Sequence, residues 1–303
     1  MRTLLIPFLI ITIGFSQNLF LPLPQTISYN SEKVTLGRTL FFDPVLSKDN
    51  DISCNSCHFN YGADTQQFSL GTQKQKGFVN TPSIFNLPYK IGYFWNGRSE
   101  TLQEQMLDGP LYNQHEMASS KEEIEARLQN IPHYLTSFQK IYHQKPSLEL
   151  VLDAIVEFEN TLISKNSKFD QYLRNQLSLS KDEQRGMELF VSYGCASCHN
   201  GINIGGNSYQ KFGTVIEIED KLDKWEDRSK VTGHQEDKMV FIVPSLRNVA
   251  KTAPYFHTGD IKTLKEAIML MGYYNIGVFL TNEEIDYIEK FLETLTGDLP
   301  ETL

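Results

Sequence analysis

Three observations predict a mainly helical protein of two domains. The 303 residues suit two domains at about 100–200 residues each. Three capping boxes, in which Ser or Thr precedes Glu by three positions, open predicted helices at Ser120, Ser180 and Thr281. A weak repeat, Gly-x-x-Leu-Phe at 37–41 and again at 186–190, precedes a cysteine pair in each half. Patterns typical of strands are few.

The N-terminal half contains three predicted helices and one long loop region. After an extended strap over 19–30, a short helix covers 34–42 and ends at Asp43-Pro44. Residues 59–100 are rich in Gly, Asn, Gln and aromatic side chains without a helical period, which predicts a long ordered loop region of functional importance. Further helices run from Ser120 to about residue 130 and over 147–163.

The C-terminal half begins after a polar stretch, 164–176, which is the predicted domain boundary. Helices are predicted over 181–192, over 263–271 and from Thr281 onward. The last helix gathers its apolar residues on one face: Ile285, Ile288, Phe291, Leu292 and Leu295. In each half, a helix therefore leads into a cysteine motif.

Composition narrows both function and location. Hydrophobic residues make up 40% and charged residues 21%, which excludes a mainly disordered chain and a polytopic membrane protein. The net charge of −9, from 28 basic and 37 acidic residues, argues against a nucleic-acid partner, because such proteins carry a basic footprint. Residues 1–16 have a basic start, an apolar run and a small residue at the end, which predicts a signal peptide; an uncleaved anchor is the alternative.

All four cysteines fall in two C-x-x-C-H motifs, Cys54-Asn-Ser-Cys57-His58 and Cys195-Ala-Ser-Cys198-His199. This is the attachment pattern of c-type haem: two thiols on one turn add to the two vinyl groups, and the histidine that follows becomes an axial iron ligand. Two copies that use every cysteine of an exported chain predict two covalently bound haem c groups. Two redox disulfides or a split zinc site are the alternatives.

The sixth position of each iron decides its chemistry. A His/Met pair gives a high-potential electron-transfer site, whereas an open position admits ligands. Three methionines follow the second motif, namely Met239, Met269 and Met271. The last two share one predicted helix, and spacing alone does not separate them.

Further motifs over about residues 31–298 resemble the bacterial di-haem cytochrome c peroxidases and the related di-haem enzyme of methylamine utilisation. They are Leu36-Gly-Arg-Thr-Leu-Phe-Phe-Asp43, Asn80-Thr-Pro82, Phe94-Trp-Asn-Gly-Arg98, Gln105, Gly109-Pro110, Glu116-Met117, Val243-Pro-Ser-Leu-Arg-Asn248, Thr252-Ala-Pro-Tyr-Phe-His-Thr-Gly259 and Met271-Gly272. The resemblance implies two cytochrome-c-like helical domains with one c-type haem each, the haems facing a shared interface. We expect an N-terminal peroxidatic domain at 17–165 and a C-terminal electron-transfer domain at 166–303.

The resemblance also assigns metal ligands. It implies that Met271 is the axial ligand of the second haem and that Met269 belongs to the core. It further implies an interdomain calcium ion, bound by Asn80 and by the backbone carbonyls of Thr252 and Pro254.

The resemblance places the family's catalytic glutamate at Glu116, its active-site glutamine at Gln105 and its tryptophan between the haems at Trp95. Peroxide must lose one proton and gain another on the leaving oxygen, and a single carboxylate serves both steps. Gln105 would orient the peroxide through a hydrogen bond. Each residue also has an ordinary structural interpretation: a solvated loop carboxylate, an exposed helix amide and a core indole.

Other histidines and arginines have lesser expected roles. His257 is expected in the core or on a haem propionate rather than on iron. His133 and His143 are expected on a further helix, on the surface. Arg98 and Arg247 are candidate propionate partners, because arginine pairs with carboxylates bidentately.

One position departs from the family. Many members close the first haem with a distal histidine shortly before the Asn-Thr-Pro motif; here that position is Thr72, and no histidine lies between residues 59 and 114. Threonine is a poor haem ligand, so we expect a first haem that is five-coordinate or water-bound at rest and needs no reductive activation. The remaining candidate ligands are His115, Met106, Lys74 and Lys76.

The sequence therefore predicts a periplasmic cytochrome c peroxidase that reduces hydrogen peroxide to water. A small periplasmic cytochrome c or cupredoxin would dock near His199 and Met271, and electrons would pass Trp95 to the first haem. One alternative is a di-haem oxidase of a partner protein, as in methylamine utilisation; the missing distal histidine favours it, but that enzyme carries tyrosine where Met271 stands. The other is a non-enzymatic di-haem electron carrier. The family also suggests a homodimer.

Overall fold

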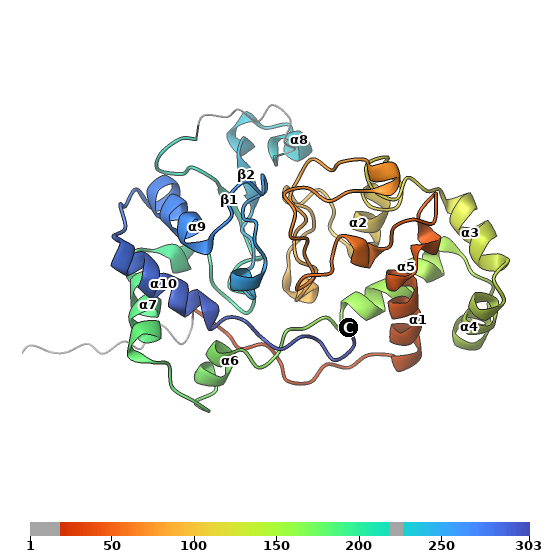
Figure 1. Cartoon of the computed structure of the whole chain (residues 1–303), viewed down its shortest axis with the longest axis horizontal. Coiled ribbons are helices and arrows are strands. Elements are labelled where there is room, and N and C mark those ends of the chain that lie inside the picture. The colour runs from red at the N-terminus through yellow and green to blue at the C-terminus, as the bar shows by residue number, and fades with distance from the viewer. Residues whose placement is uncertain (1–18, 219–226) are drawn as a thin grey trace, which may run out of the picture.

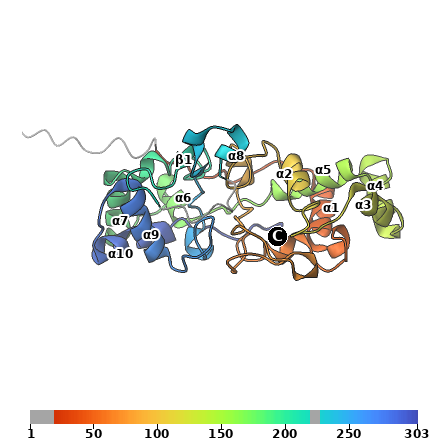
Figure 2. The ribbon, with the colours of Figure 1, turned by 90° about the horizontal axis from the view of Figure 1, so that it is seen from above.

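The computed structural model describes residues 19–218 and 227–303, so the predicted signal peptide, 1–16, lies outside the described residues. The chain forms two mainly helical lobes, one from each half of the sequence (Figure 1). Seen from above, the lobes lie side by side along the long axis of the molecule (Figure 2). Within the described ranges, no helix is long and apolar enough to cross a membrane.

The N-terminal lobe is built on two crossed helices, α1 (Ser31–Phe42) and α5 (Leu148–Glu159). They approach most closely at Gly37, where a Cβ atom would lie 1.9 Å from the carbonyl oxygen of Ala154. Any other residue at this position would therefore separate the two helices. The shorter helices of this lobe are α2 (Leu102–Asp108), α3 (Lys121–Gln129) and α4 (Pro132–Tyr142).

The C-terminal lobe repeats this crossing with α7 (Lys181–Ser192) and α10 (Asn282–Glu293). A Cβ atom on Gly186 would lie 1.9 Å from the carbonyl oxygen of Tyr287. Each glycine of the sequence repeat therefore allows two helices to cross in close contact. The other elements are α6 (Lys168–Leu173), α8 (Ser229–Thr232), α9 (Leu264–Met271), a π-helical turn (Gly272–Ile276), and the antiparallel strands β1 (Tyr209–Lys211) and β2 (Val240–Ile242).

The chain ends cross between the lobes. Phe20 packs in the C-terminal core, with its ring 5.4 Å from that of Phe169. In the opposite direction, Arg38 of α1 donates a hydrogen bond to the carbonyl oxygen of Leu303 at 2.9 Å. We keep 17–165 and 166–303 as proposed domains, with these two end segments each reaching the other lobe.

The structure confirms the mainly helical class, and a helix occupies every predicted helical segment. Ser120, Ser180 and Thr281 each accept a hydrogen bond from the backbone amide of the glutamate three residues on. The predicted helix over 147–163 ends earlier, at Glu159, because the chain tightens into a turn in which the Thr161 amide donates to the Phe158 carbonyl.

Helices α2, α6 and α8 and both strands were not predicted. The predicted loop region 59–100 contains only short 3-10 turns. Two 3-10 turns lie in that region, Thr72–Lys74 and Leu87–Tyr89. The other 3-10 turns of the described residues lie at Pro44–Leu46, Cys54–Ser56, Cys195–Ser197, Gln235–Asp237 and Val249–Lys251.

Candidate functional site

Each C-x-x-C-H motif folds as a tight 3-10 turn that brings its two thiols to one side. In the first, the amide of Cys57 donates to the carbonyl of Cys54 at 3.2 Å; in the second, Cys198 donates to Cys195 at 3.3 Å. All four thiols are free. Burial raises the pKa of Cys57 and of Cys195 to about 11, whereas a redox-active thiol has a lowered pKa. The turns therefore fit attachment sites better than redox disulfides.

Both motifs open onto one continuous cavity of about 1060 Å³, which lies between the lobes. That volume lies just above the roughly 300–1000 Å³ of ordinary ligand pockets. Its walls are rich in apolar side chains, as a large flat macrocycle requires. In the part of the chain that the structure describes, no group of three or more His, Cys, Asp or Glu side chains could hold a metal ion, which gives the zinc alternative no support.

The two motif histidines are both neutral near pH 7. Burial lowers the pKa of His58 and of His199 to about 4. Nδ1 of His58 lies 2.7 Å from the carbonyl oxygen of Gly62, which only accepts hydrogen bonds, so the proton must sit on Nδ1. Nε2 of His58 is thereby left as a lone-pair donor, the state that an iron ligand needs.

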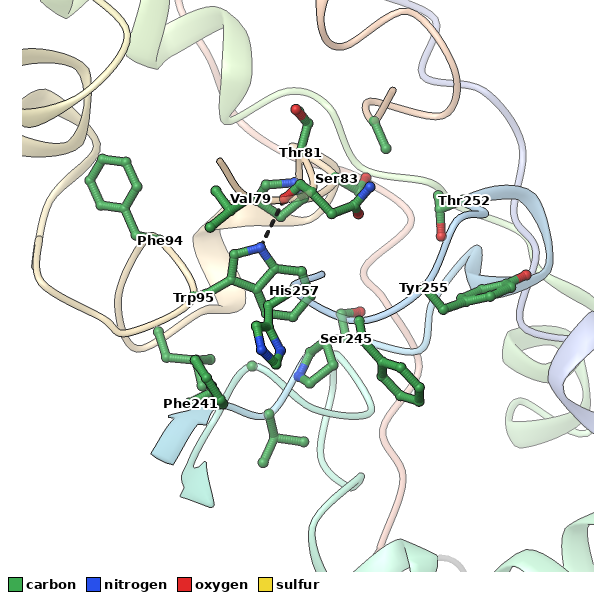
Figure 3. A pocket seen from close by; sticks show the side chains of 18 of the residues that line it. Val79, Thr81, Ser83, Phe94, Trp95, Phe241, Ser245, Thr252, Tyr255 and His257 are labelled. Atoms are coloured by element: carbon green, nitrogen blue, oxygen red, sulfur yellow. Dashed lines mark hydrogen bonds between the residues drawn. The ribbon is translucent and has the colours of Figure 1, made fainter. Parts of the chain in front are cut away.

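Trp95 joins the two lobes at the cavity wall (Figure 3). Its Nε1 donates to the carbonyl oxygen of Asn80 at 2.9 Å, and its own carbonyl accepts from Ile242 of β2 at 2.8 Å. The ring of His257 meets the indole edge-on, with centroids 6.1 Å apart. The indole is thus held rigidly at the contact between the lobes.

Glu116 and Gln105 line the same cavity from the N-terminal lobe. Asn113 Nδ2 donates to Glu116 Oε1 at 3.0 Å. Burial raises the pKa of Glu116 to about 6, while the positive charge of Arg98 and the Asn113 hydrogen bond act against that rise. A carboxyl group with a pKa this close to neutral can both accept and return a proton.

Comparison with known proteins decides the family. The model of the di-haem cytochrome c peroxidases matches residues 31–178, and that of cytochrome c matches 183–296. Cytochrome c551 peroxidase of Nitrosomonas europaea is 40% identical over 284 residues, which cover 92% of this chain and 84% of that protein. The chain belongs to the di-haem cytochrome c peroxidase family. It is an oxidoreductase of the cytochrome c peroxidase type, and its two cytochrome c domains with C-x-x-C motifs imply two haem c groups.

Other relatives agree with this assignment. Cytochrome c551 peroxidase of Pseudomonas aeruginosa is 38% identical and covers 93% of this chain and 85% of its own length. Methylamine utilization protein MauG of Methylophilus methylotrophus is 29% identical over 255 residues, 82% of this chain and 74% of that protein. Among solved structures, a MauG-like protein associated with microbial copper homeostasis superposes with a TM-score of 0.81 at 29% identity, over 91% of this chain and 92% of that one. The predicted fold of two cytochrome-c-like domains is confirmed.

The methionines of this di-haem peroxidase separate clearly. Met271 ends α9 and lines the cavity, whereas Met269 on the same helix is 45% exposed. Met269 is therefore a surface residue, which corrects the expectation that it lies in the core. Met239 is buried outside the residues that line the cavity. These positions support Met271 as the proposed iron ligand.

The three proposed calcium ligands also line the cavity. The Asn80 side chain is buried, and its amide nitrogen reaches the carbonyls of Gln66 and Gln67 at 3.3 and 3.4 Å. Thr252 lies across the cavity wall from Trp95 in Figure 3, and Pro254 follows it. One amide and backbone carbonyls form an all-oxygen set, which suits a hard cation such as Ca²⁺.

Thr72 is not among the residues that line the cavity. Its hydroxyl donates to Asp51 Oδ1 at 2.8 Å, and its amide donates to the carbonyl of Glu116 at 2.8 Å. Gly71 before it packs so closely that a Cβ atom would lie 2.1 Å from the carbonyl oxygen of His115. Of the other candidate ligands, His115 and Met106 line the cavity, whereas Lys74 and Lys76 are not among its lining residues.

The structure changes the interpretation of one arginine. Arg247 forms a fully buried ion pair with Asp170 at 3.0 Å, so its guanidinium is already committed to a protein carboxylate. Arg98 instead stacks over the ring of Phe94, 3.3 Å from the centroid. His257 is 3% exposed and stacks on Phe241, in keeping with a core histidine. His133 and His143 are exposed, as expected.

Two cavity residues were missed from the sequence. Glu159, the last residue of α5, is 6% exposed, and its Oε2 has no hydrogen-bond partner among residues 19–218 and 227–303. Burial raises its pKa to about 8. Lys90 lies in the predicted loop region, and burial lowers its pKa to about 8. Nothing in the sequence singles out either residue, because their burial results from contacts with distant segments.

Proposed function

We propose that this enzyme reduces hydrogen peroxide to two waters in the periplasm, taking two electrons from a small c-type cytochrome or cupredoxin and two protons from solvent. The observation that carries the proposal is the single cavity that both haem motifs share with Glu116 and Gln105. The names of the Nitrosomonas and Pseudomonas relatives include cytochrome c551, which supports a c-type cytochrome as donor. The bound haems supply the electron carriers and the centre at which the peroxide O–O bond breaks.

Within the N-terminal lobe, Glu116 moves the proton. As a carboxylate it accepts a proton from peroxide, and as a carboxylic acid it returns that proton to the leaving oxygen. Asn113 fixes the carboxylate through its hydrogen bond, and the charge of Arg98 keeps Glu116 ionised above about pH 6. Gln105 of α2 donates a hydrogen bond that orients the peroxide.

Electrons enter through the C-terminal lobe. His199 and Met271 would hold the second haem there, and three exposed apolar side chains on α9 and around the π-helical turn that follows Met271 are the proposed donor-docking patch. This docking patch comprises Phe279 (81% exposed), Val215 (57%) and Met269 (45%). Exposed apolar side chains of this size are typical of transient protein contacts. Trp95 then couples the two haems across the contact between the lobes.

A haem attached at Cys54 and Cys57 would be held by His58, and the proposal is that no side chain of this chain would close its other face at rest. The Thr72 hydroxyl bonded to Asp51 supports this proposal, because the hydrogen bond holds the side chain at the family's distal-ligand position outside the cavity. A bound calcium ion at Asn80, Thr252 and Pro254 would stiffen the same interface, and chelation with EGTA should weaken electron transfer between the haems. A homodimer is also proposed, from the family alone.

Oxidation of a partner protein remains the second candidate function, favoured by the absence of a histidine at position 72 and by the MauG relatives. Peroxide turnover with reduced cytochrome c tests the main proposal, measured once on the fully ferric enzyme and once after pre-reduction. We expect equal, multiple turnover in both. No turnover with the cytochrome, but oxidation of an added partner protein, would favour the second candidate. Turnover only after pre-reduction would refute the open face.

A further inference from the structure

Four basic side chains line the cavity within the described residues, and they differ in how their charge is balanced: Lys90, Arg98, Lys211 and Arg247. Arg247 pairs with Asp170, and both side chains are fully buried. Lys211 is 42% exposed and lies 3.7 Å from a carboxylate. Only water or carboxylate neighbours of this kind make a cation stable inside a protein.

Among the described residues, Lys90 lacks a carboxylate neighbour. Its ammonium donates one hydrogen bond, to the carbonyl oxygen of Ser83 at 3.1 Å. Among residues 19–218 and 227–303, no carboxylate oxygen lies within 4.0 Å of it. An ammonium offers three donors, and this hydrogen bond uses one of them, so two donors of Lys90 remain for a group bound in the cavity.

The side chain of Lys90 lies between the two haem sites. On one side, it bonds to Ser83, and the next residue, Ile84, donates its amide to the Gly62 carbonyl that also lies 2.7 Å from His58 Nδ1. On the other, its stem passes the loop that follows the second motif: a Cβ atom on Gly206 would be 3.3 Å from Lys90 Cγ. The neighbouring amide of Ile91 donates to the carbonyl of Gly206 at 2.9 Å, which fixes the two loops together. The ammonium is therefore held at the contact between the lobes, on the cavity wall.

We propose that Lys90 binds a haem propionate, so that the contact between the lobes contains a carboxylate-binding site. A propionate is the anion that an attached haem brings into this cavity, and it would supply the charge and the acceptors that Lys90 lacks. In return, the ammonium would neutralise a negative charge beside the iron and favour the reduced state. The inference rests on haem attachment at the two C-x-x-C-H motifs and does not depend on peroxidase turnover.

The test uses the full-length holoprotein, without peroxide. Lys90→Met removes the cation, Lys90→Arg keeps it, and Lys48→Met removes an exposed cation of the same lobe as a matched control. Two properties are measured: the midpoint potential of each haem by spectroelectrochemistry, and the propionate bending band by resonance Raman spectroscopy.

In Lys90→Met, we expect the reduced-to-oxidised ratio of one haem at fixed potential to fall about tenfold, equivalent to about 59 mV for one electron. The propionate band should shift in the same variant. Lys90→Arg and Lys48→Met should resemble the wild type. The haem whose potential moves identifies the propionate that Lys90 binds.

Unchanged potentials and an unchanged propionate band in Lys90→Met would overturn the proposal. If that variant does not incorporate haem, Lys90→Gln replaces it, because glutamine retains a neutral donor. The wild-type propionate band should in addition shift in D₂O, since the ammonium protons exchange; a band insensitive to D₂O would likewise overturn the assignment.

Discussion

The two lobes share one design and differ in what surrounds the motif histidine. In both, a glycine allows two helices to cross, and the cysteines lie on a 3-10 turn. In the N-terminal lobe, however, the cavity gathers two carboxyl groups whose pKa values are raised, Glu116 and the buried Glu159. In the C-terminal lobe, the cavity wall from α9 and α10 is apolar, with Ile268, Met271 and Leu292.

This difference suits one lobe to proton transfer and the other to electron transfer, although both are built on the same pair of crossed helices. Proton transfer requires a carboxyl group whose pKa lies near the working pH, and burial of Glu116 provides one. Electron transfer requires no proton donor, and an apolar wall with a methionine ligand favours a high potential. In the proposed reaction, the N-terminal lobe binds peroxide and the C-terminal lobe binds the electron donor.

The largest expected effect comes from Glu116→Gln. Loss of the carboxylate removes the group that accepts and returns the proton, so peroxide turnover should fall by about 10²–10⁴-fold. Glu100→Gln, an exposed glutamate before α2, serves as the control and should keep full activity. Reduction of the C-terminal haem by the donor should be unchanged in both variants. If Glu116→Gln retained wild-type turnover, proton transfer would not depend on the N-terminal lobe's Glu116, and the proposed difference between the lobes would be wrong.

Glu159 should lower the stability of the N-terminal lobe in a pH-dependent way. Its pKa is about 8 in the folded protein and 4.5 as the ordinary value, so the unfolded chain releases a proton between these pH values while the folded chain retains it. The free energy of unfolding is therefore not reduced by Glu159 below about pH 4.5, and it falls as the pH rises from 4.5 towards 8. Glu159→Gln should be more stable than wild type at pH 8 by on the order of a few kcal/mol, and the gain should vanish near pH 4.5.

Thermal unfolding of the holoprotein at pH 5 and pH 8 checks this expectation. Glu149→Gln, on the exposed start of the same helix, is the control variant. An equal difference in melting temperature at the two pH values would show that Glu159 is not a buried acid.

The pH profile of turnover should reflect the N-terminal site alone. Because Glu116 must be ionised to accept a proton and its pKa is raised to about 6, kcat/KM for peroxide should rise as pH rises through about 6. One unit below that value, the rate should be about tenfold lower. Stopped-flow reduction of the C-terminal haem should lack this step. A step of equal size in both measurements would place the titration outside the Glu116 site.

The smallest effect should come from the docking patch. Phe279→Ser removes its most exposed apolar side chain, so KM for the donor should rise about fivefold, equivalent to about 1 kcal/mol. KM for peroxide should remain unchanged, since the change lies in the other lobe. Steady-state kinetics with each substrate varied in turn checks this; a rise in the peroxide KM alone would contradict the assigned docking patch.

Local patterns predicted much of this molecule. Capping boxes at Ser120, Ser180 and Thr281 located three helices, because a cap depends on residues within one turn. Helix α2 has the same capping box, formed by Thr101 and Glu104, so its start could also have been predicted from the sequence. The cysteine spacing predicted the two attachment turns for the same local reason.

What the sequence did not reveal depends on long-range contacts. Strands β1 and β2 pair across almost thirty residues, Tyr209 opposite Ile242. Arg247 pairs with Asp170, which lies 77 residues away in the sequence. This ion pair occupies the guanidinium that was a candidate propionate partner. Lys90 became a candidate only when the fold placed its side chain on the cavity wall.

Electron paramagnetic resonance of the fully ferric holoprotein tests the division between the lobes most directly. An N-terminal haem with an open face should give a high-spin signal, and a C-terminal haem held by His199 and Met271 should give a low-spin signal. We predict both signals in equal amounts, without prior reduction. Two low-spin signals with no high-spin component would contradict the account, because both irons would then be closed.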